Sequence, residues 1–197
     1  MEGCSRCGFV HQCICEHIPS IQNSAHFALL THSNELARET NTGKLMMQTL
    51  EHCEVIEWQR KTPPQKLLDQ IHNKQVQPFL VYPSEHSVSL TEISFPKSNK
   101  VPPALFIILD GTWQEAKKMI NKSDWLKALP CIHLDVSQRS GYQLRRNQED
   151  GHLCTCEVAS QILEGTGQAA QANLLSQYFE LYMAVFQADK SGHALKH

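Results

Sequence analysis

The chain lacks any apolar segment long enough to cross a lipid bilayer. Its longest apolar runs hold six residues, whereas a membrane-spanning helix needs about 20. The first residues also lack the apolar core of a secretory signal peptide. We therefore expect a cytoplasmic protein that makes no membrane contact.

The chain also has little net charge. Its formal charge is −2, from 18 Lys and Arg against 20 Asp and Glu, which excludes a strongly basic protein that binds nucleic acid over its whole surface. The charges are unevenly spread, because between Lys97 and Arg146 nine basic residues outnumber four acidic ones by five. That local excess suits the docking of a polyanion such as RNA. An ordinary solvated face is the alternative.

Internal repeats and low-complexity tracts are absent as well. A chain of 197 residues has room for one ordinary core. Its content of 41% hydrophobic and 19% charged residues is typical of a globular protein. We expect a small cysteine-rich segment at residues 1–20, a main domain at 21–190 and a tail at 191–197.

Strand and helix patterns alternate along the main domain. The sequence predicts strands at residues 26–31, 53–58, 79–82, 104–109 and 131–136. It predicts helices at residues 43–50, 63–73, 113–121, 157–164 and 169–188, with prolines in the first turn of the second helix. This alternation indicates an α/β fold with a mostly parallel sheet.

The most informative segment is 104–118, where six apolar residues run into Asp110. Such a continuous run predicts a strand buried on both faces. Thr112 and Glu115 stand at the spacing of a capping box that starts the next helix. Ligands of open α/β sheets bind at the carboxyl ends of the strands. Asp110 and Trp113 are therefore candidate functional residues.

Four of the eight cysteines lie close together near the N-terminus, as Cys4-x2-Cys7-x5-Cys13-x-Cys15. Four thiolates can bind zinc tetrahedrally, and the metal would then supply folding energy to a segment too small to bury a core. We predict a structural Zn²⁺ site at Cys4, Cys7, Cys13 and Cys15. The alternatives are a redox pair, a disordered tail, and substitution of one ligand by His11 or His17.

Cys154 and Cys156 alternate with Leu153, Thr155 and Glu157. On an extended segment alternate residues face opposite ways. We interpret the two thiols as packing residues and the other three as facing the site.

Several motifs together resemble the DTW-domain family. They are Asp110-Gly-Thr-Trp113, a segment from His32 through Gly43 to Leu45, the turn Tyr82-Pro83-Ser84, and Ser140-x-Tyr142-x-Leu144-Arg145 followed by Leu153-x-Thr155-x-Glu157. The resemblance implies a SPOUT-like, knotted α/β catalytic domain. It also implies transfer of the 3-amino-3-carboxypropyl group of S-adenosylmethionine to a uridine of tRNA, as in bacterial members.

That reaction would need an aligned donor and an acceptor for the uridine N3 proton. Asp110 is the candidate base, and a structural role at the strand end is its equal alternative. Thr112 and Glu115 suit helix capping, and Trp113 suits stacking on a base or packing on the sheet. Gly43 is expected to permit an unusual backbone conformation.

The resemblance and the strand ends assign the remaining site residues. Cofactor-binding candidates are Tyr82, Pro83, Ser84, Gly111, Thr112, Trp113, Leu134, Tyr142, Leu144, Arg145, Thr155 and Glu157. RNA-binding candidates are His32, Glu35, Arg38, Asn41, Lys117, Lys118 and Arg146. We expect S-adenosyl-L-methionine as the donor, tRNA as the partner, and a monomer.

Other functions remain open at this point. The same reaction could act on ribosomal RNA, or the same fold could transfer a methyl group to RNA. A non-catalytic zinc-containing RNA-binding protein is the alternative of a different class. A cysteine hydrolase is poorly supported, because none of the eleven histidines stands at a spacing that selects a Cys–His pair.

Overall fold

A six-stranded parallel sheet forms the centre of the computed structural model, which describes residues 3–95, 101–135 and 153–196. The strand order is β2-β1-β5-β3-β6-β4, and every pairing is parallel. The strands are β1 (His26–Thr31), β2 (Cys53–Glu57), β3 (Gln77–Val81), β4 (Val88–Ser89), β5 (Ala104–Asp110) and β6 (Cys131–His133). Because all are parallel, their carboxyl ends meet at one edge of the sheet.

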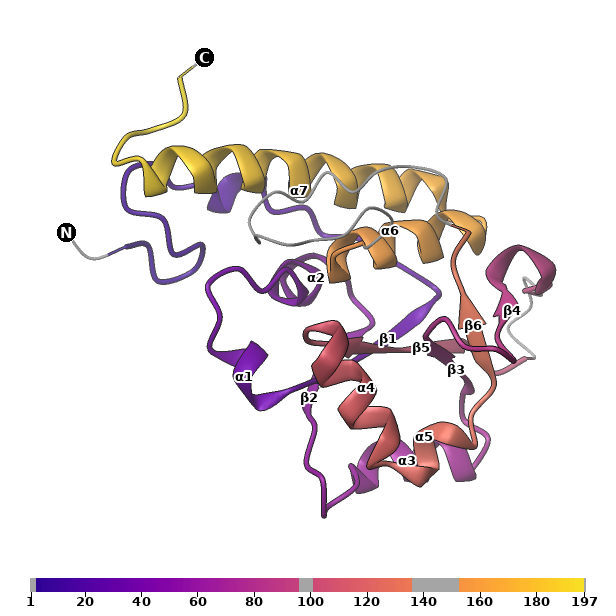
Figure 1. Cartoon of the computed structure of the whole chain (residues 1–197). Helices are drawn as coiled ribbons and strands as arrows, with labels where there is room; N and C mark the ends of the chain where they lie inside the picture. Colours follow the sequence, from indigo (N-terminus) through magenta and orange to yellow (C-terminus); the bar gives the residue numbers. More distant parts are fainter. Residues whose placement is uncertain (1–2, 96–100, 136–152, 197) are drawn as a thin grey trace.

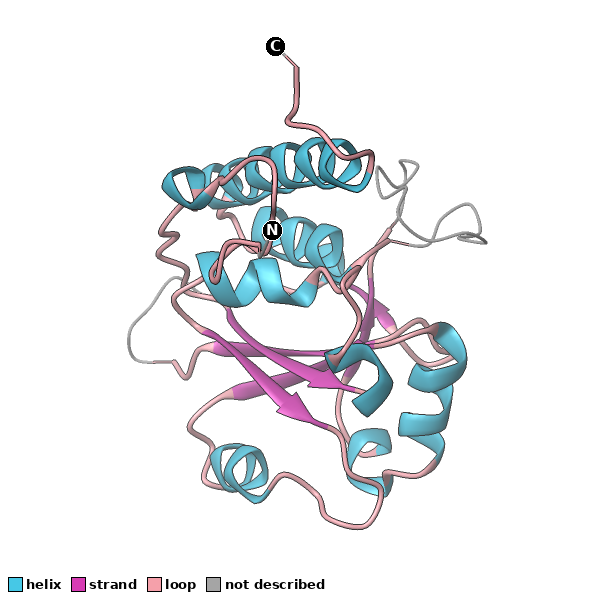
Figure 2. Cartoon of the chain, turned by 90° about the vertical axis from the view of Figure 1, so that its left-hand side faces the viewer, coloured by secondary structure: helices cyan, strands magenta, loops and turns pink. Residues whose placement is uncertain are grey.

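Helices cover both faces of this sheet (Figure 1). The helices are α1 (Ser33–Leu36), α2 (Gly43–Thr49), α3 (Gln65–His72), α4 (Trp113–Asn121), α5 (Asp124–Lys127), α6 (Thr155–Gly165) and α7 (Ala169–Lys190), with 3-10 turns at Cys15–His17 and Leu90–Glu92. Figure 2, turned by 90°, shows the strands lying between the two helical layers. The predicted α/β class and parallel sheet are confirmed.

The sheet divides the apolar interior into two clusters, as the two-residue repeat of a strand requires. Phe27 and Leu29 of β1 pack with residues of α2, α6 and α7. Ala28 and Leu30 face the opposite way and pack with residues of α3, α4 and α5. Burial of β5 on both faces explains why its sequence is continuously apolar.

The predicted bounds coincide with the observed ones for two elements. The strand at 26–31 and the helix at 113–121 match β1 and α4. The strand expected at 131–136 is too long, because β6 ends at His133 where its pairing with β4 ends. Residue 136 itself lies outside the described residues. Pro64 precedes the first residue of α3 instead of lying within its first turn. The short elements α1, β4 and α5 were not predicted.

The N-terminal segment packs against the last helix. The ring of Phe9 lies 5.1 Å from that of Tyr182 and 6.3 Å from that of Phe186. The backbone N–H groups of Val10 and His11 donate to Asp189 near the end of α7. Residues 7, 9 and 14 thereby join the core cluster of the main domain.

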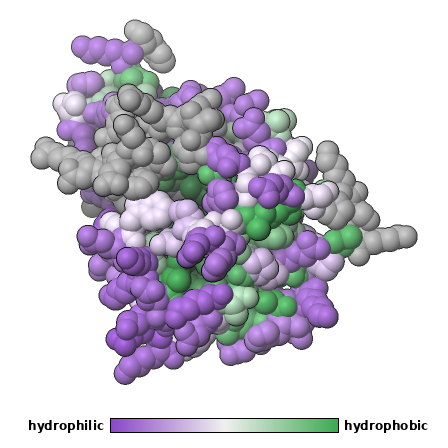
Figure 3. Space-filling view, turned by 45° about the vertical axis from the view of Figure 1, so that its right-hand side comes forward, coloured by the Kyte–Doolittle hydropathy of each residue, from purple (hydrophilic) through white to green (hydrophobic). Residues whose placement is uncertain are grey.

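None of the helices that the structure describes has the length and apolarity of a membrane span. On the face shown in Figure 3, hydrophilic side chains separate the apolar surface into small patches.

Candidate functional site

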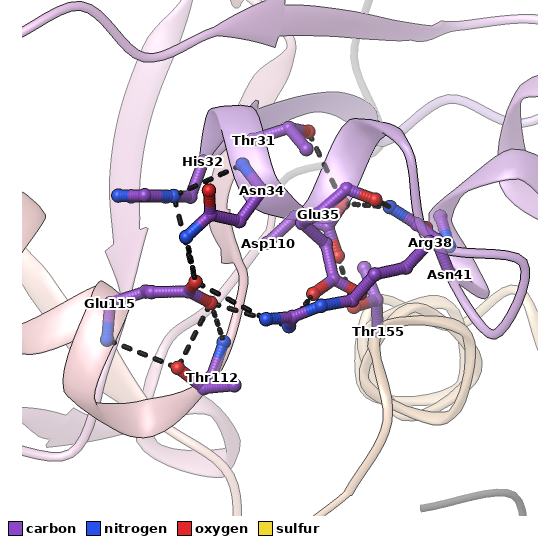
Figure 4. Close-up of polar contacts among 11 residues, drawn as sticks. Thr31, His32, Asn34, Glu35, Arg38, Asn41, Asp110, Thr112, Glu115 and Thr155 are labelled. Atoms are coloured by element: carbon purple, nitrogen blue, oxygen red, sulfur yellow. Dashed lines mark hydrogen bonds and ion pairs between the residues drawn. The ribbon is translucent and has the colours of Figure 1, made fainter.

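The carboxyl ends of β1 and β5 lie side by side and bring Thr31 opposite Asp110. Both side chains are buried, with 2% of Asp110 exposed. The loop before α2 adds Asn41, and the first residue of α6 adds Thr155 (Figure 4). Residues of β1, of the loop before α2 and of α6 thus meet at the carboxylate that ends β5.

Three side chains donate hydrogen bonds to Asp110. Thr155 Oγ1 donates to Oδ1 at 2.7 Å. Asn41 Nδ2 and Thr31 Oγ1 donate to Oδ2 at 2.9 Å and 3.2 Å. The backbone carbonyl of Asp110 also accepts the N–H of His32 at 3.0 Å. Asp110 therefore holds β1, β5 and α6 together at the strand ends.

Burial raises the pKa of Asp110, because a charged carboxylate is poorly solvated in the interior. The hydrogen bonds from Thr155, Asn41 and Thr31, and the charge of Arg38, oppose this effect without cancelling it. The carboxyl pKa is therefore higher than that of an exposed aspartate. A shift in this direction makes the carboxylate a stronger proton acceptor.

An ionic network beside Asp110 fixes α1 to the start of α4. Arg38 pairs with Glu35 and, at 3.4 Å, with Glu115 (Figure 4). Asn34 Nδ2 donates to Glu115 at 3.0 Å. His32 lies 3.6 Å from Glu115, and its ring stacks on Trp58. The loop that follows β1 is thereby held in place on the turn that follows β5.

The predicted capping box at α4 is confirmed. Thr112 Oγ1 accepts the Glu115 N–H at 3.3 Å, and Glu115 Oε2 accepts the Thr112 N–H at 2.8 Å. Burial alone would raise the pKa of Glu115. The Thr112 N–H, Asn34, the Thr112 hydroxyl and Arg38 outweigh it and lower the pKa to about 2.

This lowered pKa predicts a loss of stability in acid. A depressed carboxyl pKa contributes stability that is present above the unfolded-state value and is lost as the pH falls through the folded-state value. The free energy of unfolding should therefore decrease between pH 4.5 and about pH 2. Glu115→Gln should flatten that decrease in urea titrations, whereas Glu180→Gln, at an exposed position of α7, should not. Equal pH slopes for Glu115→Gln and the parent would contradict this assignment.

Gly43 lies against Asp110, where a side chain would collide. A Cβ at this position would stand 2.9 Å from Asn41 Oδ1 and 3.1 Å from Asp110 Oδ2. Its backbone φ is not positive, since the described glycines with positive φ are Gly8, Gly167 and Gly192. The prediction of an unusual backbone conformation was therefore wrong, and close approach is the reason for glycine.

The predicted cofactor residues that the structure describes lie at neighbouring strand ends. The ring of Tyr82, after β3, lies 5.9 Å from that of Trp113, which is 44% exposed. Ser84 donates its N–H to Ser87, and Leu134 packs partly against the core. Pro83 lies in the turn after β3, and Gly111 follows β5. Tyr142, Leu144, Arg145 and Arg146 lie outside the described residues.

The start of α6 corrects one local prediction. Residues 153–157 were expected to be extended, but α6 begins at Thr155, and Glu157 accepts the Cys154 N–H at 2.8 Å. Thr155 points to Asp110 because it is the first residue of the helix. Cys154 and Cys156 are buried, which confirms their interpretation as packing residues.

The predicted RNA-binding residues divide into two sets. His32, Glu35 and Asn41 are buried, and Arg38 is partly exposed. The buried three form hydrogen bonds and an ion pair within the protein, which favours a positioning role for them. Lys117 and Lys118 are exposed on α4.

The sulfurs of Cys4, Cys7, Cys13 and Cys15 lie within 4.8 Å of one another. Three of their separations are 3.5, 3.7 and 3.9 Å, too long for disulfides at about 2.05 Å. Four sulfurs bound tetrahedrally at about 2.3 Å from zinc stand roughly 3.8 Å apart. The group could therefore hold a metal ion. His11 contacts Asp189 and His17 contacts Glu16, so neither belongs to it.

A pocket of about 320 Å³ opens beside Asp110, between the ends of β1 and β2 and the helices α1 and α2. Most residues of its wall were not predicted from the sequence. The pairing of Thr31 with Asp110 at the ends of β1 and β5 places one end of the wall. Its lining residues are Thr31, Leu36, Arg38, Asn41, Gly43, Lys44, Met47, Gln48, Val55 and Asp110.

Comparison with known proteins identifies the family of the chain. The model of the DTW domain matches residues 1–187. A Drosophila melanogaster protein named tRNA-uridine aminocarboxypropyltransferase 2 is 29% identical over 170 residues, 82% of this chain and 64% of its own. A Mus musculus protein of the same name is 26% identical over 162 residues, 80% of this chain and 54% of its own. The chain thus spans less than two thirds of either relative. No solved structure matches.

Proposed function

This chain belongs to the DTW-domain family, and from that premise we propose that it is a tRNA-uridine aminocarboxypropyltransferase. It transfers the 3-amino-3-carboxypropyl group of S-adenosylmethionine to N3 of a uridine in tRNA. The observation that carries the proposal is the buried carboxylate of Asp110, held at the strand ends in a chain whose relatives bear that enzyme's name.

The reaction is a displacement at the carbon attached to sulfur. Uridine N3 loses its proton and forms a bond to Cγ of the methionine moiety, while the Cγ–S bond breaks and its electron pair stays on sulfur. The sulfonium becomes the neutral thioether of methylthioadenosine. Asp110 accepts the N3 proton, and its raised pKa favours that role.

The cofactor loops are proposed at the strand ends on the β3 and β6 side of Asp110. Trp113 and Tyr82 offer aromatic surface for the adenine. Gly111, Thr112 and Leu134 lie on the same edge of the sheet, and Thr155 and Glu157 fix the start of α6 beside it. Tyr142, Leu144 and Arg145 complete the proposed set. We also propose that the parallel sheet has the knotted SPOUT-like topology.

The RNA-binding role is proposed for the cations around this edge. Lys117, Lys118 and Arg146 would contact phosphates, and Arg38 reaches the pocket beside Asp110. His32 and Glu35 position Arg38 and the loop after β1 instead of touching RNA. The protein is proposed to act as a cytoplasmic monomer.

A structural zinc ion is proposed at the four cysteines. Their sulfurs have the spacing of a tetrahedral thiolate site, and four protein ligands would leave no position for a substrate. The ion would hold the loops of residues 4–15 in the form that packs on α7.

The test is incubation of the purified protein with unmodified tRNA and S-adenosylmethionine, followed by mass spectrometry of the nucleosides. The expected products are uridine carrying one aminocarboxypropyl group and an equal amount of methylthioadenosine. A methylated nucleoside with S-adenosylhomocysteine would overturn the reaction and keep the cofactor. Product on ribosomal RNA alone would change the substrate. Absence of both product and cofactor binding would favour a non-catalytic RNA-binding protein.

A further inference from the structure

The pocket beside Asp110 has a buried polar end and an exposed apolar rim. Thr31, Asn41, Gly43 and Asp110 form the buried end. The rim holds three large apolar side chains, and these are 46% exposed at Leu36, 44% at Met47 and 37% at Val55. Exposed apolar side chains that line one concave site mark the place of a ligand with an apolar surface.

The polar groups of the pocket include an acceptor and several donors. Asp110 is the acceptor, and it lines the pocket together with Gly43, where a side chain would stand 3.1 Å from its Oδ2. Arg38, Lys44 and Gln48 also line the pocket and carry donors. The Gln48 amide is oriented by contacts with the Arg6 carbonyl at 3.2 Å and the Tyr178 hydroxyl at 3.3 Å. Lys44 donates to the Glu39 carbonyl and lies over the Tyr182 ring.

None of the proposed cofactor residues in the loops after β3 and β6 lines this pocket. Tyr82, Trp113 and Leu134 follow β3, β5 and β6, whereas the pocket lies on the β1 and β2 side of the same edge. Asp110 is the residue that both regions share. A base positioned between two reactants has this arrangement, with S-adenosylmethionine on one side and the target nucleotide on the other.

We infer that this pocket receives the target uracil base, with its N3–H directed to Asp110 and its ring faces covered by Leu36, Met47 and Val55. This inference rests on the proposed function, and it assigns the site of the nucleotide that receives the aminocarboxypropyl group. Enzymes that modify a base in RNA remove it from the stack into such a pocket. Uracil places two carbonyl acceptors beside one N–H donor, which complements a carboxylate with donors around it.

The same geometry accounts for selection against cytosine. Cytosine N3 carries a lone pair instead of a hydrogen, and this lone pair would face the carboxylate of Asp110. A site that hydrogen-bonds one N–H rejects an analogue that lacks it, because that hydrogen bond is lost and two lone pairs then face each other. Uridine monophosphate should therefore bind here in preference to cytidine monophosphate.

The experiment uses the full chain labelled with carbon-13 at the methionine methyl groups. Addition of millimolar uridine 5′-monophosphate, in the presence of methylthioadenosine, should shift the Met47 resonance, while the buried Met119 and Met183 serve as internal references. Cytidine 5′-monophosphate should leave Met47 unchanged. Leu36→Trp should abolish the shift, and Leu174→Trp, which is equally exposed at 46% on α7, should preserve it.

The transfer assay supplies the second measurement. Leu36→Trp and Met47→Trp should lower kcat/KM for tRNA by at least about tenfold, with cofactor affinity within twofold of the Leu174→Trp control. A Met47 shift caused by methylthioadenosine alone, or no shift with uridine monophosphate, would overturn the assignment. Transfer by both pocket variants at the control rate would also overturn it and leave the proposed function intact. A uridine-specific Met47 shift in a protein without transferase activity would instead overturn the function and keep the pocket.

Discussion

Asp110→Asn should lower the rate of aminocarboxypropyl transfer by about 100-fold or more and leave the protein folded. The amide cannot accept the N3 proton, and loss of a general base typically costs about 10² to 10⁴ in rate. Asparagine has nearly the same shape, and its oxygen can still accept from Asn41 while the Thr155 hydroxyl turns to accept from its amide. Single-turnover transfer and cofactor affinity would be measured together.

The stability of the same variant separates a catalytic from a structural Asp110. Its pKa is raised in the folded protein, so its stabilising contribution is complete below the ordinary value of 3.8 and is lost as the pH rises through the folded-state value. At neutral pH, well above the ordinary value, the raised pKa therefore opposes folding, and a neutral amide removes that cost. Asp110→Asn should be at least as stable as the parent at pH 7 in urea titrations.

Thr155→Val provides the matched control, because it removes one donor and keeps the carboxylate. The pKa of Asp110 should rise further, and the pH at which transfer reaches half of its maximum should move upward.

Full activity of Asp110→Asn would eliminate Asp110 as the base. Strong destabilisation of Asp110→Asn at pH 7 would show that its main role is to hold the strand ends together.

Loss of the metal should lower the melting temperature by roughly 8–16 °C. Ordering the backbone costs about 1–2 kcal/mol per residue, and the cysteine segment buries few apolar side chains, among them Phe9 and Ile14. Loss of a structural metal commonly costs about 4 kcal/mol or more, and each kcal/mol shifts the melting temperature by about 2–4 °C at this chain length. Elemental analysis should find one zinc ion per chain.

Cys13→Ser is the informative variant, because Cys13 is exposed and its replacement changes little packing. It should lose the metal and melt as early as the parent treated with a chelator. Cys131→Ser is the control, since this partly buried thiol lies outside the cluster and donates to the Tyr82 carbonyl. Equal melting of Cys13→Ser and Cys131→Ser, with zinc retained in both, would contradict the proposed site.

The sequence was sufficient for features that depend on neighbouring residues. The apolar run of β5, the aspartate at its end and the capping box of Thr112 and Glu115 all follow from local periodicity and spacing. The cysteine cluster also followed, because twelve consecutive residues contain all four thiols. Short elements such as β4 have too few residues to show any period.

Features formed by distant residues could not be predicted in the same way. Arg38 meets Glu115 across 77 positions, and Thr155 meets Asp110 across 45. His32 and Glu35 were expected to bind RNA, since they are polar and lie close to a strand end. Their burial results from an ionic network that exists only once β1 and β5 are paired. The pocket wall likewise requires α2 to be packed on the sheet.

The contact between the cysteine segment and α7 joins two parts of the chain that are synthesised far apart in time. Val10 and the carboxylate of Asp189 that it binds are 179 positions apart. At about 5–20 residues per second, a ribosome needs on the order of 10–40 s to make the second after the first. Throughout that interval Phe9 has no partner ring, and the four thiols stand in solution without their docking helix. Capture of a zinc ion on the nascent chain would keep these thiols from oxidation until the segment packs on α7.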